Sequence, residues 1–352
     1  MRIVQLIDSL QVGGAERMAV NYANALSKVV KFSGLIVTRK EGLLKEQITD
    51  SVQYLFLNRK KNLDFDAYLV SRKYLIHNKI THIQAHSSSF FWAFLLKLTI
   101  PNIKIIWHDH FGNRPNISNK QKFILQLCSL FFYRVLSVSN HLSNWAKKEL
   151  MCKKILYLPN FVVLNEENNQ VFLKGTKGKR ILCLANLRVE KNHLMLLEVA
   201  FKLKKEFPEW TFHLIGNDNN DSYSALIKKK ITELELEQNV FVYGSFSNVN
   251  YILNQSDIGV LTSNFEGLPM ALLEYGFAGL PVVTTNVGEI PNVFKSDFGF
   301  MVEFKNEKLF LNALISLIKN PERKEKGIKF SMFVIEQFSE NAILKKFLEY
   351  CV

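Results

Sequence analysis

The most specific group of reactive side chains follows a short apolar segment at residues 258–261. The chain there reads Ser263-Asn264-Phe265-Glu266-Gly267-Leu268-Pro269-Met270-Ala271-Leu272-Leu273-Glu274. Gly267 permits a turn and Pro269 suits the first turn of a helix, which predicts Glu266 in a loop and Glu274 two turns into that helix. Two carboxylates can accept hydrogen bonds from vicinal hydroxyls, such as those of ribose or a hexose, while the helix start faces a phosphate. The alternative is a cap at Glu266 and a surface acid at Glu274.

Two cations stand beside a second expected helix start. Arg188 and Lys191 follow an apolar segment at residues 180–185. Two cations and a helix N-terminus together form a cradle for a diphosphate. Ordinary surface charge would explain either cation taken alone.

Histidines follow two expected strands in the first half of the chain. His86 precedes Ser87-Ser88-Ser89, and His108-Asp109-His110 follows residues 103–108. Both groups are expected at the carboxyl edge of a sheet, which favours a functional role over a structural one. A His-x-His pair could bind zinc, but no Cys or carboxylate partner stands at the spacing of known zinc motifs.

Gly13-Gly14 forms the expected turn after the first strand. Two glycines before a helix let the backbone approach an anion. The pattern is not G-x-G-x-x-G, so a nicotinamide dinucleotide site is weakly supported and a tight turn is the simpler interpretation. Asp64-Phe65-Asp66 matches the D-x-D pattern of metal-dependent transferases, but it opens an expected helix and is read as a chance match.

These residues need elements to position them, and short apolar runs alternate with helix-period segments along the chain. This order is typical of an α/β fold with parallel sheets covered on both faces. We expect strands at residues 2–7, 32–38, 52–57, 82–85, 103–108, 134–138, 154–158, 180–185, 211–215, 240–243, 258–261 and 281–284. We expect helices at residues 15–27, 65–77, 90–98, 120–132, 192–206, 223–234, 269–278, 308–318 and 341–350.

The alternation stops at residues 160–179, which are polar and lack periodicity, and then resumes. We therefore expect two Rossmann-like domains at residues 1–165 and 166–335, facing each other across a cleft. A C-terminal helix within 336–352 is expected to return to the N-terminal domain.

Composition narrows the class of protein. The 352 residues are 48% hydrophobic and 22% charged, which is globular rather than disordered. Residues 1–160 hold 23 Lys and Arg against 9 Asp and Glu, a net +14, whereas residues 161–352 are at −1. This asymmetry predicts an anionic partner for the first half, such as a phospholipid surface, a phosphorylated substrate or nucleic acid. Four scattered cysteines and no apolar run of membrane-spanning length favour a cytoplasmic protein.

The run from Glu266 through Gly279-Leu280-Pro281-Val282-Val283-Thr284-Thr285-Asn286-Val287-Gly288 resembles the E-x(7)-E region of family 4 retaining glycosyltransferases. The resemblance is specific over residues 180–302, and Gly13-Gly14, His86 and His110 extend it into the first half. It implies the GT-B fold and transfer of a sugar from a nucleotide sugar, without a metal or other cofactor.

The resemblance also implies roles for the donor-binding residues. Glu274 would bind ribose hydroxyls, and Glu266 would contact the transferred sugar beside the backbone N–H groups of Gly267 and Leu268. Lys191 would hold the diphosphate. Cations and helix N-termini can stabilise charge on a departing diphosphate, which in this family is held to assist deprotonation of the acceptor.

The remaining roles are less closely matched. The family commonly has an arginine five residues before the lysine; here Asn186 stands there, and we expect Arg188 to replace it. Gly14 would contact donor phosphate or acceptor, and His110, rather than His108, would lie near the anomeric centre.

Further acceptor contacts are expected from His86, His108 and Arg17. We expect a UDP-sugar donor, with GDP-mannose close behind, and a glycan or lipid-linked glycan acceptor of bacterial surface polysaccharide or lipopolysaccharide.

The apolar stripe Phe123, Leu127, Leu130 and Phe131 is either core or a face turned to the inner membrane surface. Membrane contact would make the protein peripheral on that surface. A nucleotide-sugar epimerase of the same fold is the alternative enzyme. Binding of nucleic acid is not expected, because no recognition motif accompanies the charge.

Overall fold

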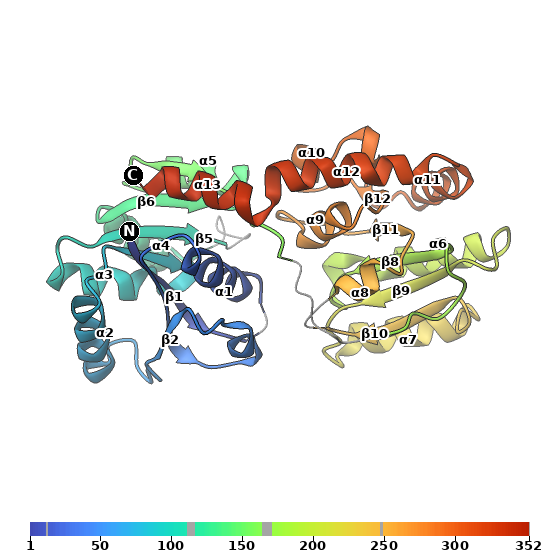
Figure 1. Ribbon diagram of the computed structural model, residues 1–352. Helices are drawn as coiled ribbons and strands as arrows, with labels where there is room; N and C mark the ends of the chain where they lie inside the picture. Colours follow the sequence, from blue (N-terminus) through green and yellow to red (C-terminus); the bar gives the residue numbers. More distant parts are fainter. Residues whose placement is uncertain (12, 111–116, 164–170, 247–248, 352) are drawn as a thin grey trace. The chain divides into compact units, whose positions relative to one another are not determined.

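The chain folds into two compact α/β units (Figure 1). The computed structural model describes residues 1–11, 13–110, 117–163, 171–246 and 249–351. Met1–Asn160 and Ile343–Val352 form the first unit, and Phe161–Ala342 form the second. The last ten residues therefore belong to the unit that the chain begins with.

Within its described residues, the first unit has a seven-stranded sheet in the order β3-β2-β1-β4-β5-β6-β7. All neighbouring strands pair in parallel. The strands are β1 (Arg2–Ser9), β2 (Phe32–Lys40), β3 (Gln53–Phe56), β4 (His82–His86), β5 (Lys104–Asp109), β6 (Phe132–Ser137) and β7 (Ile155–Tyr157).

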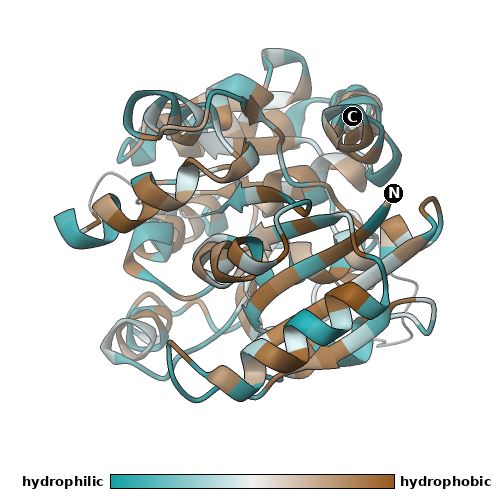
Figure 2. Cartoon of the chain, turned by 90° about the vertical axis from the view of Figure 1, so that its left-hand side faces the viewer, coloured by the Kyte–Doolittle hydropathy of each residue, from teal (hydrophilic) through white to brown (hydrophobic). Residues whose placement is uncertain are grey.

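Helices cover both faces of this sheet because successive strand side chains point to opposite sides. Val4 and Leu6 pack in the core shared with four helices, α2 (Phe65–His77), α3 (Phe90–Thr99), α4 (Asn119–Ser129) and α5 (Asn140–Glu149). Ile7 and Leu35 pack instead against α1 (Gly14–Ser27). Figure 2 looks onto this unit and shows brown, hydrophobic stretches along its strands.

The last helix, α13 (Glu340–Cys351), contributes its C-terminal part to the first unit. Phe347 is fully buried and its ring lies 5.2 Å from that of Tyr22 on α1. The two ends of the chain thus share one hydrophobic core, although hundreds of residues separate them.

Within its described residues, the second unit has a six-stranded parallel sheet in the order β10-β9-β8-β11-β12-β13. The strands are β8 (Arg180–Leu184), β9 (Thr211–Ile215), β10 (Val240–Gly244), β11 (Ile258–Leu261), β12 (Val282–Thr285) and β13 (Gly299–Val302).

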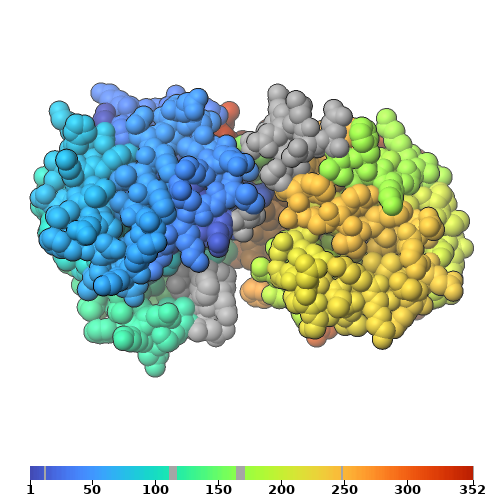
Figure 3. Space-filling view, turned by 90° about the horizontal axis from the view of Figure 1, so that it is seen from below, coloured from blue at the N-terminus to red at the C-terminus, as the bar shows by residue number. Residues whose placement is uncertain are grey.

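Two helical layers cover this second sheet. One core joins the strands to α6 (His193–Lys204), α7 (Ser222–Glu233) and α11 (Glu307–Lys319). The other joins them to α8 (Asn250–Leu253), α9 (Met270–Phe277), α10 (Ile290–Val293) and α12 (Arg323–Phe338). Seen from below, most of the visible surface of this unit is yellow and orange, the colours of the part of the chain that contains α7, β10 and α8 (Figure 3). Four short 3-10 helices complete the described elements: Leu43–Gln47, Ser87–Ser89, Val189–Lys191 and Ser296–Phe298.

The structure confirms the expected alternation and corrects several of its details. The expected helix at residues 120–132 ends at Ser129, because Phe132 already begins β6. Helices α5, α8, α10 and α12 and the edge strand β13 were not expected. The buried residues Phe330, Val334 and Phe338 recur at helical spacing, a signal that the charged start of α12 obscured.

Asp64 caps α2 by accepting a hydrogen bond from the Ala67 N–H at 3.2 Å. The D-x-D match is therefore a helix start, as the sequence indicated.

The stripe Phe123, Leu127, Leu130 and Phe131 lies on the surface, with exposed fractions from 41 to 61%. Phe131 contacts only the edge of Phe94 on α3 among the described aromatic rings, at 5.1 Å between centroids. The helices of the described chain are all too short or too polar to cross a bilayer.

Candidate functional site

Each sheet has one place where the order of its strands reverses direction. In the first unit this point lies between β1 and β4, and in the second between β8 and β11. The loops that follow these strands diverge to opposite sides of the sheet, which leaves a crevice where ligands of α/β proteins bind. Lys191 follows β8 and Glu266 follows β11, whereas the other candidate residues of the sequence analysis lie on these loops, on the helices after them or at the ends of β4 and β5.

In the second unit, an ion pair joins the two loops at the reversal point. Lys191 follows β8 and Glu266 follows β11, and Lys191 Nζ lies 2.6 Å from Glu266 Oε1. The Ser263 hydroxyl donates to the same oxygen at 2.6 Å. Glu266 is only 7% exposed, and these two hydrogen bonds satisfy its buried Oε1.

Hydrogen bonds to backbone carbonyls hold the two loops together. The Asn264 N–H donates to the Glu190 carbonyl at 2.8 Å, and the Thr262 hydroxyl donates to the Lys191 carbonyl at 2.9 Å. The loop after β12 joins them, since the Thr285 hydroxyl donates to the Ser263 carbonyl at 2.7 Å. The position of Glu266 is thus set by three strands rather than by its own loop.

Gly288 brings the backbone of the β12 loop against Glu266. Its φ is +56°, and a Cβ atom added there would lie 1.7 Å from the Glu266 carbonyl oxygen. Only glycine fits this close approach, and the Glu289 N–H bonds to the Gly267 carbonyl beside it at 3.4 Å. The sequence analysis gave Gly288 no role; its place in the run that carries the family resemblance was the available signal.

The other donor-side candidates surround this pair. Glu274 is half-buried on α9, and Arg188 is exposed before the short 3-10 helix Val189–Lys191. Gly267 and Leu268 lie in the loop before α9, where a Cβ on Gly267 would meet nothing within 4 Å. Asn186 stands where the family commonly has an arginine, and its side-chain oxygen accepts from the Asn217 N–H at 2.8 Å.

In the first unit, Gly14 opens α1 directly after the loop that follows β1. Gly14 is exposed and Gly13 is the N-cap residue, with no side chain capping the helix. The Glu16 carboxylate lies against this helix start and accepts a hydrogen bond from its own backbone N–H, and Arg17 lies partly exposed in the same first turn.

The three candidate histidines meet at the carboxyl edge of β4 and β5. His86 is paired with His108 in the strand register, and both are fully buried. His110 follows β5 and is partly exposed, and its Nε2 lies 3.0 Å from His86 Nδ1. Burial lowers the pKa of His86 and His108 well below the usual value and lowers the pKa of His110 to about 3, so all three are neutral at pH 7.

Among the described residues, these three histidines form a group that could hold a metal ion, because one ring nitrogen of each lies within 4.8 Å of the others. Zinc–nitrogen bonds of about 2.0–2.1 Å place tetrahedral ligand nitrogens only about 3.4 Å apart. The spacing therefore exceeds that of a preformed site, while His86 and His110 already lie at hydrogen-bonding distance.

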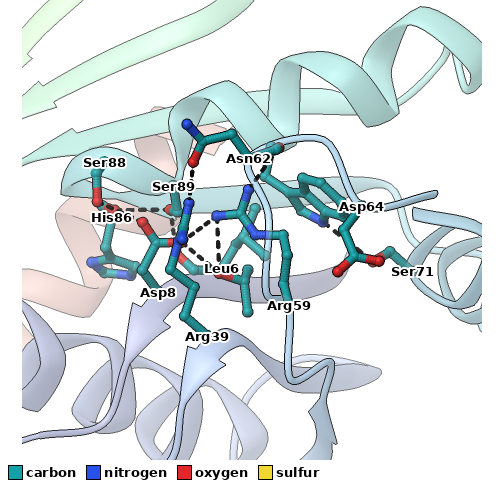
Figure 4. A network of polar contacts seen from close by, with 12 residues as sticks. Leu6, Asp8, Arg39, Arg59, Asn62, Asp64, Ser71, His86, Ser88 and Ser89 are labelled. Atoms are coloured by element: carbon teal, nitrogen blue, oxygen red, sulfur yellow. Dashed lines mark hydrogen bonds and ion pairs between the residues drawn. The ribbon is translucent and has the colours of Figure 1, made fainter. Parts of the chain in front are cut away.

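A second polar network lies at the same edge of the sheet (Figure 4). Asp8 at the end of β1 accepts hydrogen bonds from Ser88 at 2.6 Å and Arg59 at 3.1 Å. The buried Arg59 guanidinium lies over the Trp92 ring, and its burial lowers the pKa of Arg59 by desolvation. The partly exposed Arg39 donates a hydrogen bond to the side-chain oxygen of Asn62. The sequence analysis missed this network, for which an acidic residue ending the first strand was the only signal.

Two Rossmann-like units with ligand-facing loops at both reversal points define the GT-B class of glycosyltransferases. Solved structures of this class share the fold: a glycosyltransferase from Rickettsia africae superposes with a TM-score of 0.81 at 18% identity, covering 99% of this chain and 97% of that one. Anabaena HepE in complex with UDP gives 0.80 at 14% identity, covering 100% and 99%.

Sequence comparisons give the family. The model described as Glycosyltransferase Family 4 matches residues 12–166, and that described as Glycosyl transferases group 1 matches residues 165–331. An N-acetyl-alpha-D-glucosaminyl L-malate synthase of Bacillus anthracis is 30% identical over 76% of this chain and 73% of its own length. An Escherichia coli UDP-Gal:alpha-D-GlcNAc-diphosphoundecaprenol alpha-1,3-galactosyltransferase is 25% identical over 89% and 86%.

The chain belongs to the group 1 glycosyltransferases of family 4 and is a glycosyltransferase of GT-B fold. The epimerase alternative is therefore not carried further.

The close approach of Gly288 makes a direct prediction. Gly288→Ala forces a Cβ into the Glu266 carbonyl at a left-handed φ, so we expect the free energy of unfolding to fall by at least about 2 kcal/mol. Urea denaturation followed by tryptophan fluorescence measures the loss. Gly267→Ala in the facing loop adds a Cβ in open space and should leave the unfolding midpoint unchanged. Equal stability of the two variants would contradict the assigned contact.

Proposed function

We propose that this protein is a retaining glycosyltransferase that moves a sugar from a UDP-sugar to a glycan or lipid-linked glycan during assembly of a bacterial surface polysaccharide. The observation that carries the proposal is the Lys191–Glu266 pair, held between the loops after β8 and β11. It supplies a cation for a diphosphate and a carboxylate for sugar hydroxyls at the point where α/β sheets bind ligands.

The donor would lie in the second unit. Lys191 is 26% exposed, so its ammonium can leave Glu266 partly and meet a diphosphate, with Arg188 as the second cation. Glu274 would accept hydrogen bonds from the ribose hydroxyls. Glu266, with the N–H groups that follow it, would contact the transferred sugar. A departing diphosphate stabilised by cations and helix N-termini needs no metal ion.

The acceptor would lie in the first unit, where Gly14, Arg17 and the histidines stand. His110 is proposed to contact the reacting sugar from the end of β5, with His86 and His108 behind it. The diphosphate that leaves the donor would take the acceptor proton as the new glycosidic bond forms on the same face. No protein base is required for that step.

The relatives support this choice of substrates. One acts on a diphosphoundecaprenol-linked sugar with UDP-Gal, and others are named for O-antigen and capsular polysaccharide biosynthesis. HepE has been solved with UDP and with UDP-glucose. A UDP-sugar donor therefore has more support than GDP-mannose.

We also propose that the protein binds the inner membrane surface as a peripheral protein. The exposed stripe Phe123, Leu127, Leu130 and Phe131 lies within residues 1–160, which carry a net charge of +14. Apolar side chains next to cations favour an anionic lipid surface, where each cation contributes about 1 kcal/mol. This surface would bring the acceptor unit to a lipid-linked substrate.

The donor assignment predicts different defects for the two carboxylates. Glu274→Ala removes charged acceptors for ribose hydroxyls, so the Kd for UDP should rise about tenfold to a hundredfold by isothermal titration calorimetry. Glu266→Ala should mainly lower turnover with a UDP-sugar. Glu237→Ala, at an exposed glutamate of the same unit, is the matched control. UDP affinity of Glu274→Ala equal to that of the control would overturn the assignment.

The membrane proposal predicts that the stripe and the charge act together. Phe123→Ser with Leu127→Ser should weaken binding to phosphatidylglycerol vesicles about tenfold in a sedimentation assay. Met332→Ser removes a similarly exposed apolar side chain from the second unit and should change nothing. The proposal would be contradicted if vesicle binding did not change with lipid charge, with salt concentration or with either set of substitutions.

A further inference from the structure

One residue of the loop between β11 and α9 turns a large apolar side chain to solvent. The structure describes all of residues 262–269, and seven of these eight are buried or half-buried. The exception is Phe265, which is 58% exposed although Glu266 beside it is only 7% exposed. A single exposed apolar residue is ordinary on a protein surface, so its surroundings decide what it indicates.

The loop is fixed on both sides of Phe265. Before it, the Asn264 N–H donates to the Glu190 carbonyl at 2.8 Å. After it, the Glu266 carboxylate accepts hydrogen bonds from Lys191 and from a serine of the same loop, both at 2.6 Å. Phe265 therefore cannot fold its ring onto the second unit without breaking these bonds, and the ring stays at the surface until a ligand covers it.

The facing loop presents a second apolar side chain. Val189 is 64% exposed and precedes Glu190, whose carbonyl accepts the hydrogen bond from Asn264. The bond that joins the two loops thus has an exposed apolar neighbour on each strand of chain, beside the Lys191–Glu266 pair. Sites for organic ligands combine apolar and aromatic walls with a few placed polar groups, as this one does.

A pyranose ring matches this combination. Its hydroxyls lie around the rim and can donate to a carboxylate, whereas its C–H groups form an apolar face that packs on an aromatic ring. Consecutive Cα atoms are about 3.8 Å apart, so one ring is within reach of both Glu266 and Phe265. A nucleobase also packs on aromatic rings, but the proposed ribose contact, Glu274, lies further along the chain on α9.

We propose that Phe265 is a sugar-stacking residue that packs against the C–H face of a pyranose ring bound beside Glu266, with Val189 at the edge of that ring. The inference rests on the proposed glycosyltransferase function for the presence of a sugar at this loop. Both the transferred sugar and the acceptor sugar present such a face, and separate measurements on the two substrates distinguish them.

Three substitutions separate stacking from a general effect on the fold. Phe265→Ala removes the ring, and Phe265→Tyr keeps its flat face. Phe172→Ala is the matched control, because Phe172 is a 68% exposed phenylalanine of the same unit on the segment before β8, with its ring 5.6 Å from that of Tyr251. None of the three should shift the Tm of the ligand-free protein by more than about 2 °C, since both positions are exposed.

The donor measurement compares UDP with UDP-glucose, UDP-galactose and UDP-N-acetylglucosamine by isothermal titration calorimetry on the full-length protein. If the ring packs on the transferred sugar, Phe265→Ala should raise the Kd of the tightest-binding UDP-sugar about tenfold and leave the Kd of UDP within about twofold. Phe265→Tyr should stay within about threefold of the wild type. Phe172→Ala should match the wild type.

The acceptor measurement follows transfer from that UDP-sugar to an N-acetylglucosamine-diphosphate lipid and to methyl glycosides. If the ring packs on the acceptor sugar, Phe265→Ala should raise the acceptor KM about tenfold while the Kd values of UDP and of the UDP-sugar stay unchanged. Phe265→Tyr should again restore the wild-type value.

Three results would overturn the inference. A Kd of UDP that rises together with that of the UDP-sugar would assign the ring to the nucleotide. A Tm of ligand-free Phe265→Ala well below that of the control would assign it to packing within the protein. The third is no rise in either the UDP-sugar Kd or an acceptor KM, in a wild type that binds the UDP-sugar. A wild type that binds no UDP-sugar would refute the proposed function itself, and the inference would fall with it.

Discussion

The ion pair between Lys191 and Glu266 is the interaction on which the arrangement of the second unit depends. It joins the loops after β8 and β11 at 2.6 Å and keeps a charged carboxylate in a site that is 7% exposed to solvent. Removing one partner of a buried pair leaves the other charge uncompensated, at a cost of about 3–5 kcal/mol. Ser263 and Gly288 both help to hold Glu266 beside Lys191. The Ser263 hydroxyl donates to the Glu266 carboxylate, and the Gly288 backbone lies against the Glu266 carbonyl.

The carboxyl edge of the first unit combines neutral and charged groups. Its sheet also reverses direction between two strands, and buried amides and imidazoles bond to one another there. The buried Arg59 forms an ion pair with Asp8 at the strand ends, and Asp109 at the end of β5 is also buried. Both sheets thus gather polar side chains at the carboxyl ends of their central strands.

The sequence predicted most of the strands and the presence of two Rossmann-like units, because apolar runs and turn residues are local signals. It did not predict what depends on distant partners. Gly288 matters because its backbone meets Glu266, and Tyr22 of α1 packs against Phe347 from the far end of the chain. The sequence could not decide whether the stripe at Phe123 lies in the core or on the surface, because helical periodicity does not show whether another element packs against an apolar face. Helix α12 was missed because its first turns are charged.

The most direct test of a metal-independent nucleotide-sugar site is thermal unfolding of the full chain with UDP, GDP, ADP, CMP or NAD, each with and without EDTA. A ligand at 100 times its Kd stabilises the folded state by about 2.7 kcal/mol, which shifts the midpoint measurably. The account predicts a rise in Tm with UDP that persists in EDTA. A rise with NAD alone, a rise abolished by EDTA, or no rise with any nucleotide would contradict it.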